Sequence, residues 1–429
     1  MPQFRWHHWL LAGALVMTSM ASATFAQETR PTMNPTTNQT EEAEFETSAE
    51  TNPEEIRRGM RLGEQDGNSR RQRYLERVIS SVEPVLGGER DRVAAYINHF
   101  ENELISNPKM FAFNVEGQWK DDTLVLSGYV EFEENHRTLM DYIKYLGFED
   151  VEDRERVLPS EPLQAEKYGF VKSSRAKTYG NPVEPRETMT EDFIGDPLFI
   201  LDYGEGDTYL VHSSEGYIGY IDAEHVVRVD AERFAEYRSG TTATFMKPFQ
   251  AGDELTIPAG ARLRVVSRGG TDAVMELPTG ETVEVPENIL EIRAAGPPAE
   301  ALEAVATAKQ LLGTPYVWGG KSETGVDCSG LVQASYKAQG YNLARDAYMQ
   351  AYAGELTATR WCRETMMPGD LMYFLGSTGR ITHTAIYIGD DLFIEATSPV
   401  AKISSLDPEH PDYSARRDRG FCFAKRVVA

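Results

Sequence analysis

The stretch VDCSGLVQASYKAQG, residues 326–340, decides how the C-terminal third of the chain folds. Asp327 is a residue type that caps helix starts and Gly340 one that ends helices, so we expect a helix between them. Its inner face would be formed by Leu331, Val332, Ser335 and Tyr336. Cys328 then occupies the first turn, where unpaired N–H groups and the helix dipole stabilise a thiolate. The stretch therefore predicts a nucleophilic cysteine.

The segments on either side predict a helix before the cysteine and a hairpin after it. Residues 299–312 repeat apolar side chains at helical spacing and stop at Gly313 and Pro315. The apolar positions are Leu302, Val305, Ala306 and Leu312. The run GRITHTAIYIGDDLFIEA, residues 379–396, is typical of a strand, a tight turn at 389–391 and a returning strand.

His383 and Glu395 fall on the two strands of that hairpin. The other histidine of this region, His410, lies between prolines in a sequence typical of an exposed turn, so His383 is the stronger candidate for a base. Glu395 could accept the second ring N–H of His383 and fix its tautomer. Taken alone, a cysteine and a distant histidine are more often a buried thiol and an ordinary histidine.

Six ordered motifs resemble the NlpC/P60 family of papain-like cysteine peptidases: PYVWGG, DCSGL, NLARDA, MPGDLMYF, ITHTAIYIG and LFIEA. The resemblance covers nearly all of residues 300–429, and we assign 297–429 to a peptidase domain. It implies an α+β fold in which a helix bearing the cysteine packs on an antiparallel sheet bearing the histidine. It also implies hydrolysis of the bond between D-glutamate and a diamino acid, often meso-diaminopimelate, in peptidoglycan stem peptides.

The resemblance assigns the nucleophile to Cys328, the base to His383 and the third polar position to Glu395. The family commonly has His, Asn or Gln at the third position, so the glutamate is a departure. We expect its charge to raise the pKa of His383 and favour a thiolate–imidazolium pair, or else to accompany altered or absent activity. Tyr316 matches a tyrosine whose hydroxyl points at the active site; the alternative is a core aromatic beside Trp318.

The segment Ala344 to Ala347 resembles a motif of those family members that carry bacterial SH3 barrels before the peptidase domain. In that subgroup the first barrel narrows the cleft, and carboxylates and a tyrosine hold the free α-amine of L-alanine. The resemblance places substrate contacts at Asp327, Ser329, Arg345 and Asp346, with Tyr217 or Tyr220 nearby. The alternative for Arg345 and Asp346 is a local surface ion pair.

Two segments before the peptidase domain have the short alternating runs and glycine turns of small β barrels. Residues 165–232 resemble the bacterial SH3 family through 206–209 and 216–221, and residues 241–295 resemble a degenerate second copy. We expect two tandem SH3-like barrels; the alternative is one irregular β domain. Gly296, Pro297 and Pro298 mark the boundary with the peptidase domain.

The region before the barrels, residues 54–159, predicts a small α+β domain that faintly resembles BON-type domains. It has helical spacing up to about residue 108, alternating runs at 112–119 and 123–130, and a helical stretch ending at Gly147. Its role is not indicated by the sequence.

The N-terminus has the layout of a secretory signal peptide at residues 1–26, followed by a polar, disordered linker at 27–53. We therefore expect export to the periplasm or outside the cell. No later run is long enough to span a membrane, and a net charge of −24 argues against nucleic acid as a partner. The expected partner is a stem peptide or murein fragment, and the expected state is a monomer.

Three cysteines leave at least one free thiol, and Cys328 is the expected free one. A bridge between Cys362 and Cys422 is possible. No Cys and His pair has the spacing of zinc ligands, so no metal or other cofactor is expected. The alternative to a peptidase is a wall-binding protein whose peptidase domain has lost activity, with the barrels holding peptidoglycan.

Overall fold

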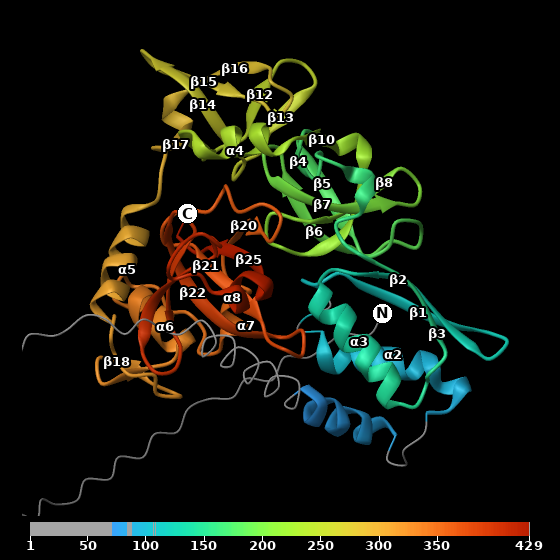
Figure 1. Cartoon of the computed structure of the whole chain (residues 1–429). Helices are drawn as coiled ribbons and strands as arrows, with labels where there is room; N and C mark the ends of the chain where they lie inside the picture. The colour runs from blue at the N-terminus through green and yellow to red at the C-terminus, as the bar shows by residue number, and fades with distance from the viewer. Residues whose placement is uncertain (1–70, 84–87, 106, 108, 429) are drawn as a thin grey trace, which may run out of the picture. The chain divides into compact units, whose positions relative to one another are not determined.

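Figure 1 shows the chain as a computed structural model that describes residues 71–83, 88–105, 107 and 109–428. Every described residue belongs to one compact unit. The expected signal peptide and linker lie outside the described residues. Within the described part, no helix combines the length and the apolar character that crossing a membrane requires.

The first part of this unit is a three-stranded sheet with helices packed on it. A helical stretch at 71–82 precedes these elements: α2 (Val93–Leu104), β1 (Phe113–Lys120), β2 (Thr123–Val130), α3 (Glu133–Tyr145) and β3 (Val151–Val157). β1 and β2 are antiparallel, whereas β2 and β3 are parallel and joined by α3. The two predicted strands and the helix after them are confirmed. β3 was not predicted, because five of its seven residues are charged.

The next part is a seven-stranded antiparallel sheet in the order β10-β4-β7-β8-β9-β5-β6. Its strands are β4 (Tyr168–Val171), β5 (Arg175–Tyr179), β6 (Thr188–Phe193), β7 (Pro197–Gly204), β8 (Thr208–His212), β9 (Ile218–Asp222) and β10 (Val226–Val229). Alternate apolar side chains such as Leu198, Ile200 and Val211 point to one buried core.

After α4 (Ala231–Ser239), a second sheet repeats this strand order on a smaller scale. It consists of β11 (Thr242–Phe245), β14 (Arg262–Gly269), β15 (Asp272–Glu276), β16 (Thr282–Pro286) and β17 (Leu290–Arg293), with β12 (Phe249–Ala251) and β13 (Leu255–Ile257) as a separate pair. The order β17-β11-β14-β15-β16 matches β10-β4-β7-β8-β9 strand for strand. The shared order supports two copies of one β unit, and their SH3 relationship stays a prediction.

The last part is an α+β domain built on a six-stranded antiparallel sheet, β20-β25-β21-β22-β23-β24. Its strands are β20 (Glu355–Thr359), β21 (Leu371–Leu375), β22 (Ile381–Gly389), β23 (Leu392–Ala396), β24 (Ala401–Ser405) and β25 (Phe421–Arg426). Its helices are α5 (Ala299–Gln310), α6 (Cys328–Lys337), α7 (Ala347–Gln350) and α8 (Ala415–Gly420), with the short pair β18 (Lys321–Ser322) and β19 (Gly325–Val326) before α6. The predicted hairpin is confirmed, with positive φ at Asp390 and Asp391 in its turn.

The apolar positions that the sequence analysis named for α5 are buried only in part. Val305 is buried as expected, but Leu302 and Leu312 are 46% and 36% exposed, whereas Ala301, Ala304 and Ala308 are buried. The small side chains allow close packing, as at Ala301, which lies against the backbone of Gly369. The apolar spacing in the sequence indicated the larger residues. Because the helix packs closely against its neighbours, alanines occupy its buried face instead.

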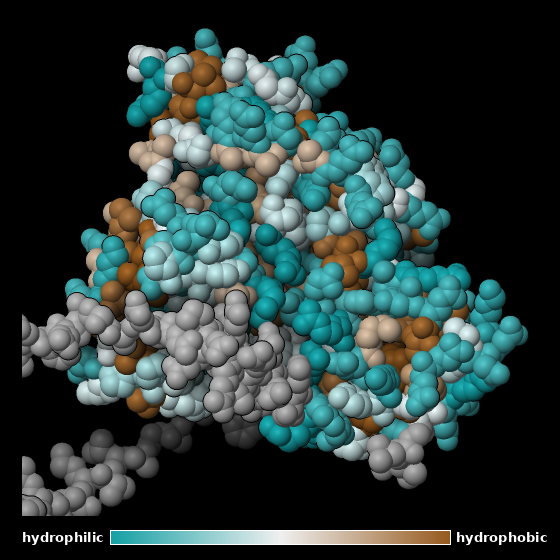
Figure 2. All heavy atoms as spheres, in the orientation of Figure 1, coloured by the Kyte–Doolittle hydropathy of each residue, from teal (hydrophilic) through white to brown (hydrophobic). Residues whose placement is uncertain are grey.

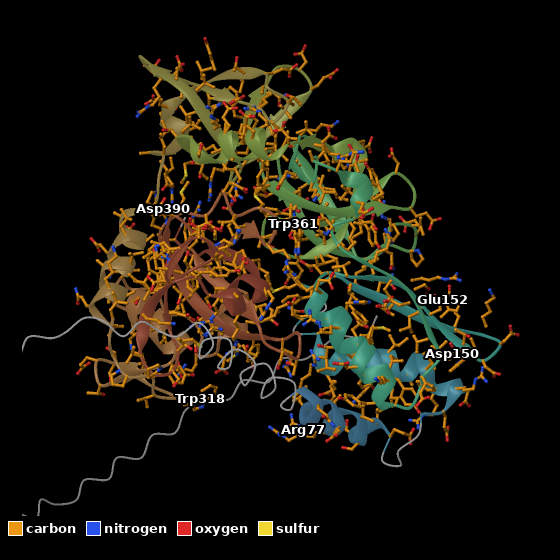
Figure 3. All side chains as sticks on the ribbon, viewed as in Figure 1. Arg77, Asp150, Glu152, Trp318, Trp361 and Asp390 are labelled. Carbon is orange, nitrogen blue, oxygen red and sulfur yellow. The ribbon has the colours of Figure 1, made fainter. Side chains whose placement is uncertain are left out.

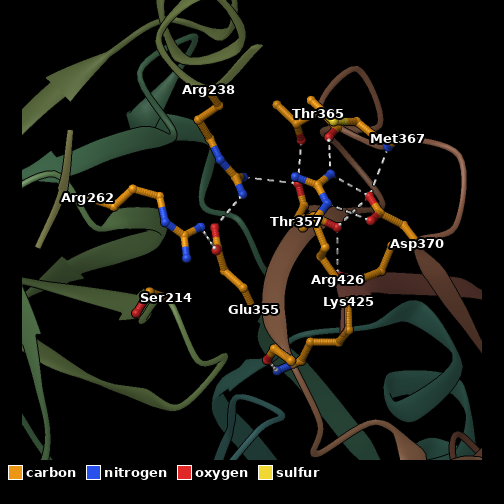
Figure 4. Close-up of polar contacts among 12 residues, drawn as sticks. Ser214, Arg238, Arg262, Glu355, Thr357, Thr365, Met367, Asp370, Lys425 and Arg426 are labelled. Carbon is orange, nitrogen blue, oxygen red and sulfur yellow. Dashed lines mark hydrogen bonds and ion pairs between the residues drawn. The ribbon is translucent and has the colours of Figure 1, made fainter. Parts of the chain in front are cut away.

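A network of charged side chains joins the β units to the C-terminal α+β domain (Figure 4). Arg238 of α4 and Arg262 of β14 donate to the two carboxylate oxygens of Glu355, at 2.8 and 3.0 Å. Arg426 of β25 donates to both oxygens of Asp370. Arg238, Arg262, Glu355 and Arg426 also line part of a cavity of about 1040 Å³, whose lining does not include Cys328 or His383.

The described surface is mostly hydrophilic on the face shown in Figure 2, where hydrophobic residues form small, separate groups. This agrees with the acidic composition of the chain.

Candidate active site

Cys328 is the first residue of α6, and Asp327 caps that helix as the sequence predicted. The Asp327 carboxylate accepts hydrogen bonds from the backbone N–H of Gly330 at 2.7 Å and of Gly319 at 2.8 Å. A side chain at Gly330 would collide with the carbonyl oxygen of Gly320. The cap therefore fixes the start of α6 against the loop that precedes it. The predicted inner face of α6 is buried.

Arg345 pairs with Asp327 and not with its neighbour Asp346. Its guanidinium donates to both Asp327 oxygens, at 3.0 and 2.5 Å, and to Ser329 Oγ at 2.9 Å. With the two backbone donors, these bonds use the lone pairs that a carboxylate offers. Asp327 therefore binds the start of the helix and Arg345, and Ser329 binds Arg345. Asp346 is exposed.

His383 lies on β22 with its Nε2 2.7 Å from Oε2 of Glu395 on β23. Glu395 is 2% exposed and has two further partners. Ser404 Oγ donates to Oε1 at 2.7 Å, and Arg417 Nε of α8 donates to Oε2 at 2.6 Å. The glutamate is thus a buried anion that is already paired with a buried arginine.

The pKa of His383 is lowered, whereas the glutamate alone was expected to raise it. Burial, followed by the positive charge of Arg417, lowers the pKa of His383 to about 4, although Glu395 acts to raise it. Burial acts to raise the pKa of Glu395, but its bonds to His383, Arg417 and Ser404 outweigh burial and hold it well below its usual range. At neutral pH His383 is therefore a neutral imidazole beside an ionised glutamate.

The thiol of Cys328 faces the same strand. α6 packs against β22 and β23, and the backbone N–H of Thr384, the residue next to His383, acts on the thiol. Burial raises the pKa of Cys328, and the N–H groups of Thr384 and Ser329 offset this only in part. Burial is thus the largest cause that opposes the expected ion pair at both residues, and the charge of Arg417 adds to it at His383. Cys328 and His383 are 7% and 6% exposed.

Tyr316 and Trp318, two aromatic residues of the preceding loop, have different surroundings. Burial, followed by the charges of Cys328 and Asp327, raises the pKa of the half-buried Tyr316. Trp318, labelled in Figure 3, is 84% exposed. Tyr316 thus stays a candidate for a contact with the reacting group, and Trp318 offers an open aromatic face beside it.

The two barrel tyrosines have other surroundings. The hydroxyl of Tyr220 lies 3.0 Å from that of Tyr129 on β2, and so contacts the N-terminal α+β part. Tyr217 lines the cavity between the β units and the peptidase domain. The structure therefore groups Tyr316, Asp327, Ser329 and Arg345 at the start of α6 and gives both barrel tyrosines different neighbours.

All three cysteines are free and buried, so the possible bridge between Cys362 and Cys422 is not formed. The thiol of Cys422 donates to the carbonyl of Tyr373 at 3.1 Å, and that of Cys362 lies 3.7 Å from Thr365 Oγ1. Burial raises the pKa of Cys362 to about 11. His410 is partly exposed in its loop, 3.9 Å from Asp412.

Arg417 is the residue of this group that the sequence analysis missed. It lies 89 positions after the cysteine in ARRDRG, a run that is typical of a solvated surface. One signal was available: a glutamate on a buried strand requires a positive partner. The sequence offers several arginines near the C-terminus, so that signal would not have identified Arg417.

The fold and these side chains define an α+β domain with a cysteine at a helix start and a histidine–glutamate pair on an antiparallel sheet. Residues 313–419 match the model of the NlpC/P60 family. This part of the chain is therefore an NlpC/P60 domain.

Curated relatives extend the likeness beyond that domain. The chain is 29% identical over 265 residues to "Dipeptidyl-peptidase 6" of Lysinibacillus sphaericus, covering 56% of this chain and 91% of the relative. It is 25% identical over 242 residues to "Gamma-D-glutamyl-L-lysine dipeptidyl-peptidase" of Bacillus cereus, covering 52% and 72%. A crystal structure of an NlpC/P60 family protein from Bacillus cereus is 21% identical and covers 61% of this chain and all of the other, with a TM-score of 0.28. A TM-score this low supports no conclusion about the fold.

Proposed function

We propose that this chain is a cysteine peptidase that hydrolyses the bond between γ-D-glutamate and a diamino acid in peptidoglycan stem peptides. The observation that carries the proposal is Cys328 at the capped start of α6, packed against the strand that bears His383 and its partner Glu395. The name of the Bacillus cereus relative, a γ-D-glutamyl-L-lysine dipeptidyl-peptidase, supports this bond, with lysine in the place of diaminopimelate.

The neutral state of His383 defines its part in the reaction. His383 takes the proton of the Cys328 thiol as the sulfur attacks the amide carbonyl, and Glu395 stabilises the imidazolium that forms. Backbone N–H groups at the start of α6 stabilise the oxyanion. His383 then protonates the departing amine, and water releases the γ-glutamyl acyl group from the sulfur.

The proposed substrate carries the free amine of an N-terminal L-alanine. An ammonium that loses water needs an anionic partner. The Asp327 carboxylate is occupied by Arg345 and two backbone donors, so we assign this contact to the exposed carboxylate of Asp346. Trimmed peptides that begin with L-Ala-γ-D-Glu are then preferred over stems whose alanine is joined to a glycan.

The test compares hydrolysis of L-Ala-γ-D-Glu-diaminopimelate by the wild type, Cys328→Ser and Cys362→Ser. Cys362 is a matched control, because it is a second buried, free cysteine of the same domain. Wild type and Cys362→Ser are expected to release diaminopimelate, and Cys328→Ser to lose at least about 1000-fold in kcat/KM. Activity that survives in Cys328→Ser would refute the proposal.

The amine contact is tested separately. Asp346→Asn is expected to raise KM for the free-amine peptide by about tenfold or more and to leave hydrolysis of its N-acetylated form unchanged. Equal effects on both peptides would remove Asp346 from substrate recognition.

A second candidate is a wall-binding protein with an impaired peptidase domain. It is favoured by the slight exposure of Cys328 and His383 and by their neutral pair at rest. In that case the wild type would sediment with purified sacculi but release no diaminopimelate between pH 5 and 9.

The remaining parts are proposed as accessory modules of an exported enzyme. We assign residues 165–232 and 241–295 to two SH3-like units, 54–159 to an N-terminal α+β domain and 297–429 to the peptidase domain. The repeated strand order of the two sheets supports the tandem arrangement.

A further inference from the structure

Three side chains that can bind metal meet between α3 and β3, outside the peptidase domain. Nε2 of His136 on α3 lies 2.9 Å from Oδ2 of Asp153 and 3.5 Å from Oε2 of Glu155, both on β3. Asp153 and Glu155 are two positions apart and so share one face of the strand. The three ligand atoms lie within 4.8 Å of one another.

The carboxylate of Glu155 is buried without a hydrogen-bond donor in the described part of the chain. Its side chain is 0% exposed, and neither of its carboxylate oxygens has a hydrogen-bond donor among the described residues. Burying a carboxylate that has no hydrogen-bond donor costs folding free energy. Nε2 of His136 does not supply this donor, because it already lies at hydrogen-bonding distance from Asp153.

The two distances from His136 fit a single small ion held between the three groups. Ligands at about 2.1 Å from a tetrahedral zinc ion lie about 3.4 Å from one another. The separations of 2.9 and 3.5 Å bracket that value. Asp153 is also oriented for binding, because its Oδ1 accepts the backbone N–H of Glu155 at 3.0 Å and leaves Oδ2 towards His136.

We propose that His136, Asp153 and Glu155 form a binding site for one divalent transition-metal ion, for which zinc is the best fit. An imidazole with two carboxylates suits zinc better than calcium or magnesium, which prefer six or more oxygen ligands. His136 and Asp153 are 22% and 35% exposed, so water has access to the fourth position. The expectation of no metal followed from Cys and His spacing and overlooked a site assembled by a helix and a strand.

The ion would have a structural role. It would join α3 to β3, the charged strand at the edge of the N-terminal sheet. The residue before His136, Asn135, donates to the carbonyl of Gly379 at 3.1 Å, just before β22 begins. Metal binding therefore stabilises the helix through which the N-terminal part contacts the peptidase domain.

The test uses untagged protein treated with a chelator and then titrated with zinc chloride. Calorimetry should detect one zinc ion per chain, and the melting midpoint should rise by about 3 °C or more at about 100 times the dissociation constant. Cobalt(II) should give the intense visible absorption of tetrahedral coordination. Glu155→Gln and His136→Gln should each lose about 100-fold or more in affinity.

Glu152→Gln is the matched control, since Glu152, labelled in Figure 3, is an exposed residue of the same strand. Its carboxylate pairs with Arg154. This variant should bind zinc as the wild type does. Without metal, Glu155→Gln should melt no lower than the wild type, because it replaces a buried carboxyl group that has no hydrogen-bond donor among the described residues with a neutral group of the same size. Absence of a zinc-dependent shift in the wild type, or equal shifts in the wild type, Glu155→Gln and His136→Gln, would overturn the proposal.

Discussion

Arg417 determines how Glu395 acts on His383. A lone carboxylate beside a histidine stabilises the imidazolium, but here the same Oε2 receives Arg417 Nε at 2.6 Å and faces His383 Nε2 at 2.7 Å. The arginine and the glutamate together carry no net charge, so the pair resembles a neutral hydrogen-bonding group in its effect on the ring. A glutamate at this position is therefore compatible with a neutral base.

Replacing Arg417 should shift the pH dependence of the Cys328 thiol. In the wild type the rate of alkylation by iodoacetamide should rise steadily from pH 5 to 9, because the pKa of Cys328 is raised and that of His383 is lowered to about 4. In Arg417→Met the unpaired Glu395 raises the pKa of His383, so a thiolate–imidazolium pair forms. The rate at pH 6 should increase by about tenfold.

Arg417→Lys is the control, because it keeps the positive charge, and its profile should follow that of the wild type. Cys362 and Cys422 should stay unmodified in both variants, since they are buried and would react only on unfolding. A profile for folded Arg417→Met that matches the wild type would contradict this account of Glu395.

At the scale of single elements, the start of α6 depends on its contact with the preceding loop. Asp327 holds Gly319 and Gly330 together, and the carbonyl of Gly320 lies where a side chain at Gly330 would be. The absence of a side chain at Gly330 is therefore what allows the loop to pack against the first turn.

Gly330→Ala should displace this loop and lower kcat/KM by about 100-fold, because it misplaces the thiol and the backbone donors beside it. Ala334→Gly, in the same helix, is the control: it should cost about 1 kcal/mol of stability with little loss of activity. Peptide hydrolysis and thermal melting of both variants measure the two effects. Equal losses of activity would show that helix stability, not the loop contact, is responsible.

The elements that could be predicted are those whose sequence signals are local. The helix from Cys328 has its cap and its end in the sequence, and the hairpin around His383 has its turn residues at Asp390 and Asp391. β3 could not be predicted, because parallel pairing with β2 holds a highly charged segment as a strand. The pairing of Arg417 with Glu395, and of Arg345 with Asp327, depends on contacts between distant segments.

At the scale of the whole described unit, Glu355 is the link between the β units and the peptidase domain. It binds Arg238 and Arg262 from two different elements, and Arg238 also donates to the carbonyl of Thr357 at 3.1 Å. Burial acts to raise the pKa of Glu355, but the charges of nearby arginines outweigh burial and lower it. The carboxylate therefore gives up its proton at a lower pH than a free glutamate does.

Glu355→Gln should lower the free energy of unfolding by about 2 kcal/mol, because it leaves the largely buried Arg238 without an anionic partner. Glu284→Gln, at an exposed position of β16, should change it by less than about 0.5 kcal/mol. Urea denaturation of the two variants provides the comparison. Equal stabilities would mean that the arginines find other partners.

The position of β25 in its sheet has a consequence for when activity first appears. β25 is an interior strand that pairs with β20 on one side and β21 on the other, although it follows all the other strands in the chain. A nascent polypeptide cannot complete the sheet that holds His383 until residues 421–426 have left the ribosome. Shortened products that lack this strand would leave β20 without its link to β21, so on the function proposed above we expect them to be inactive.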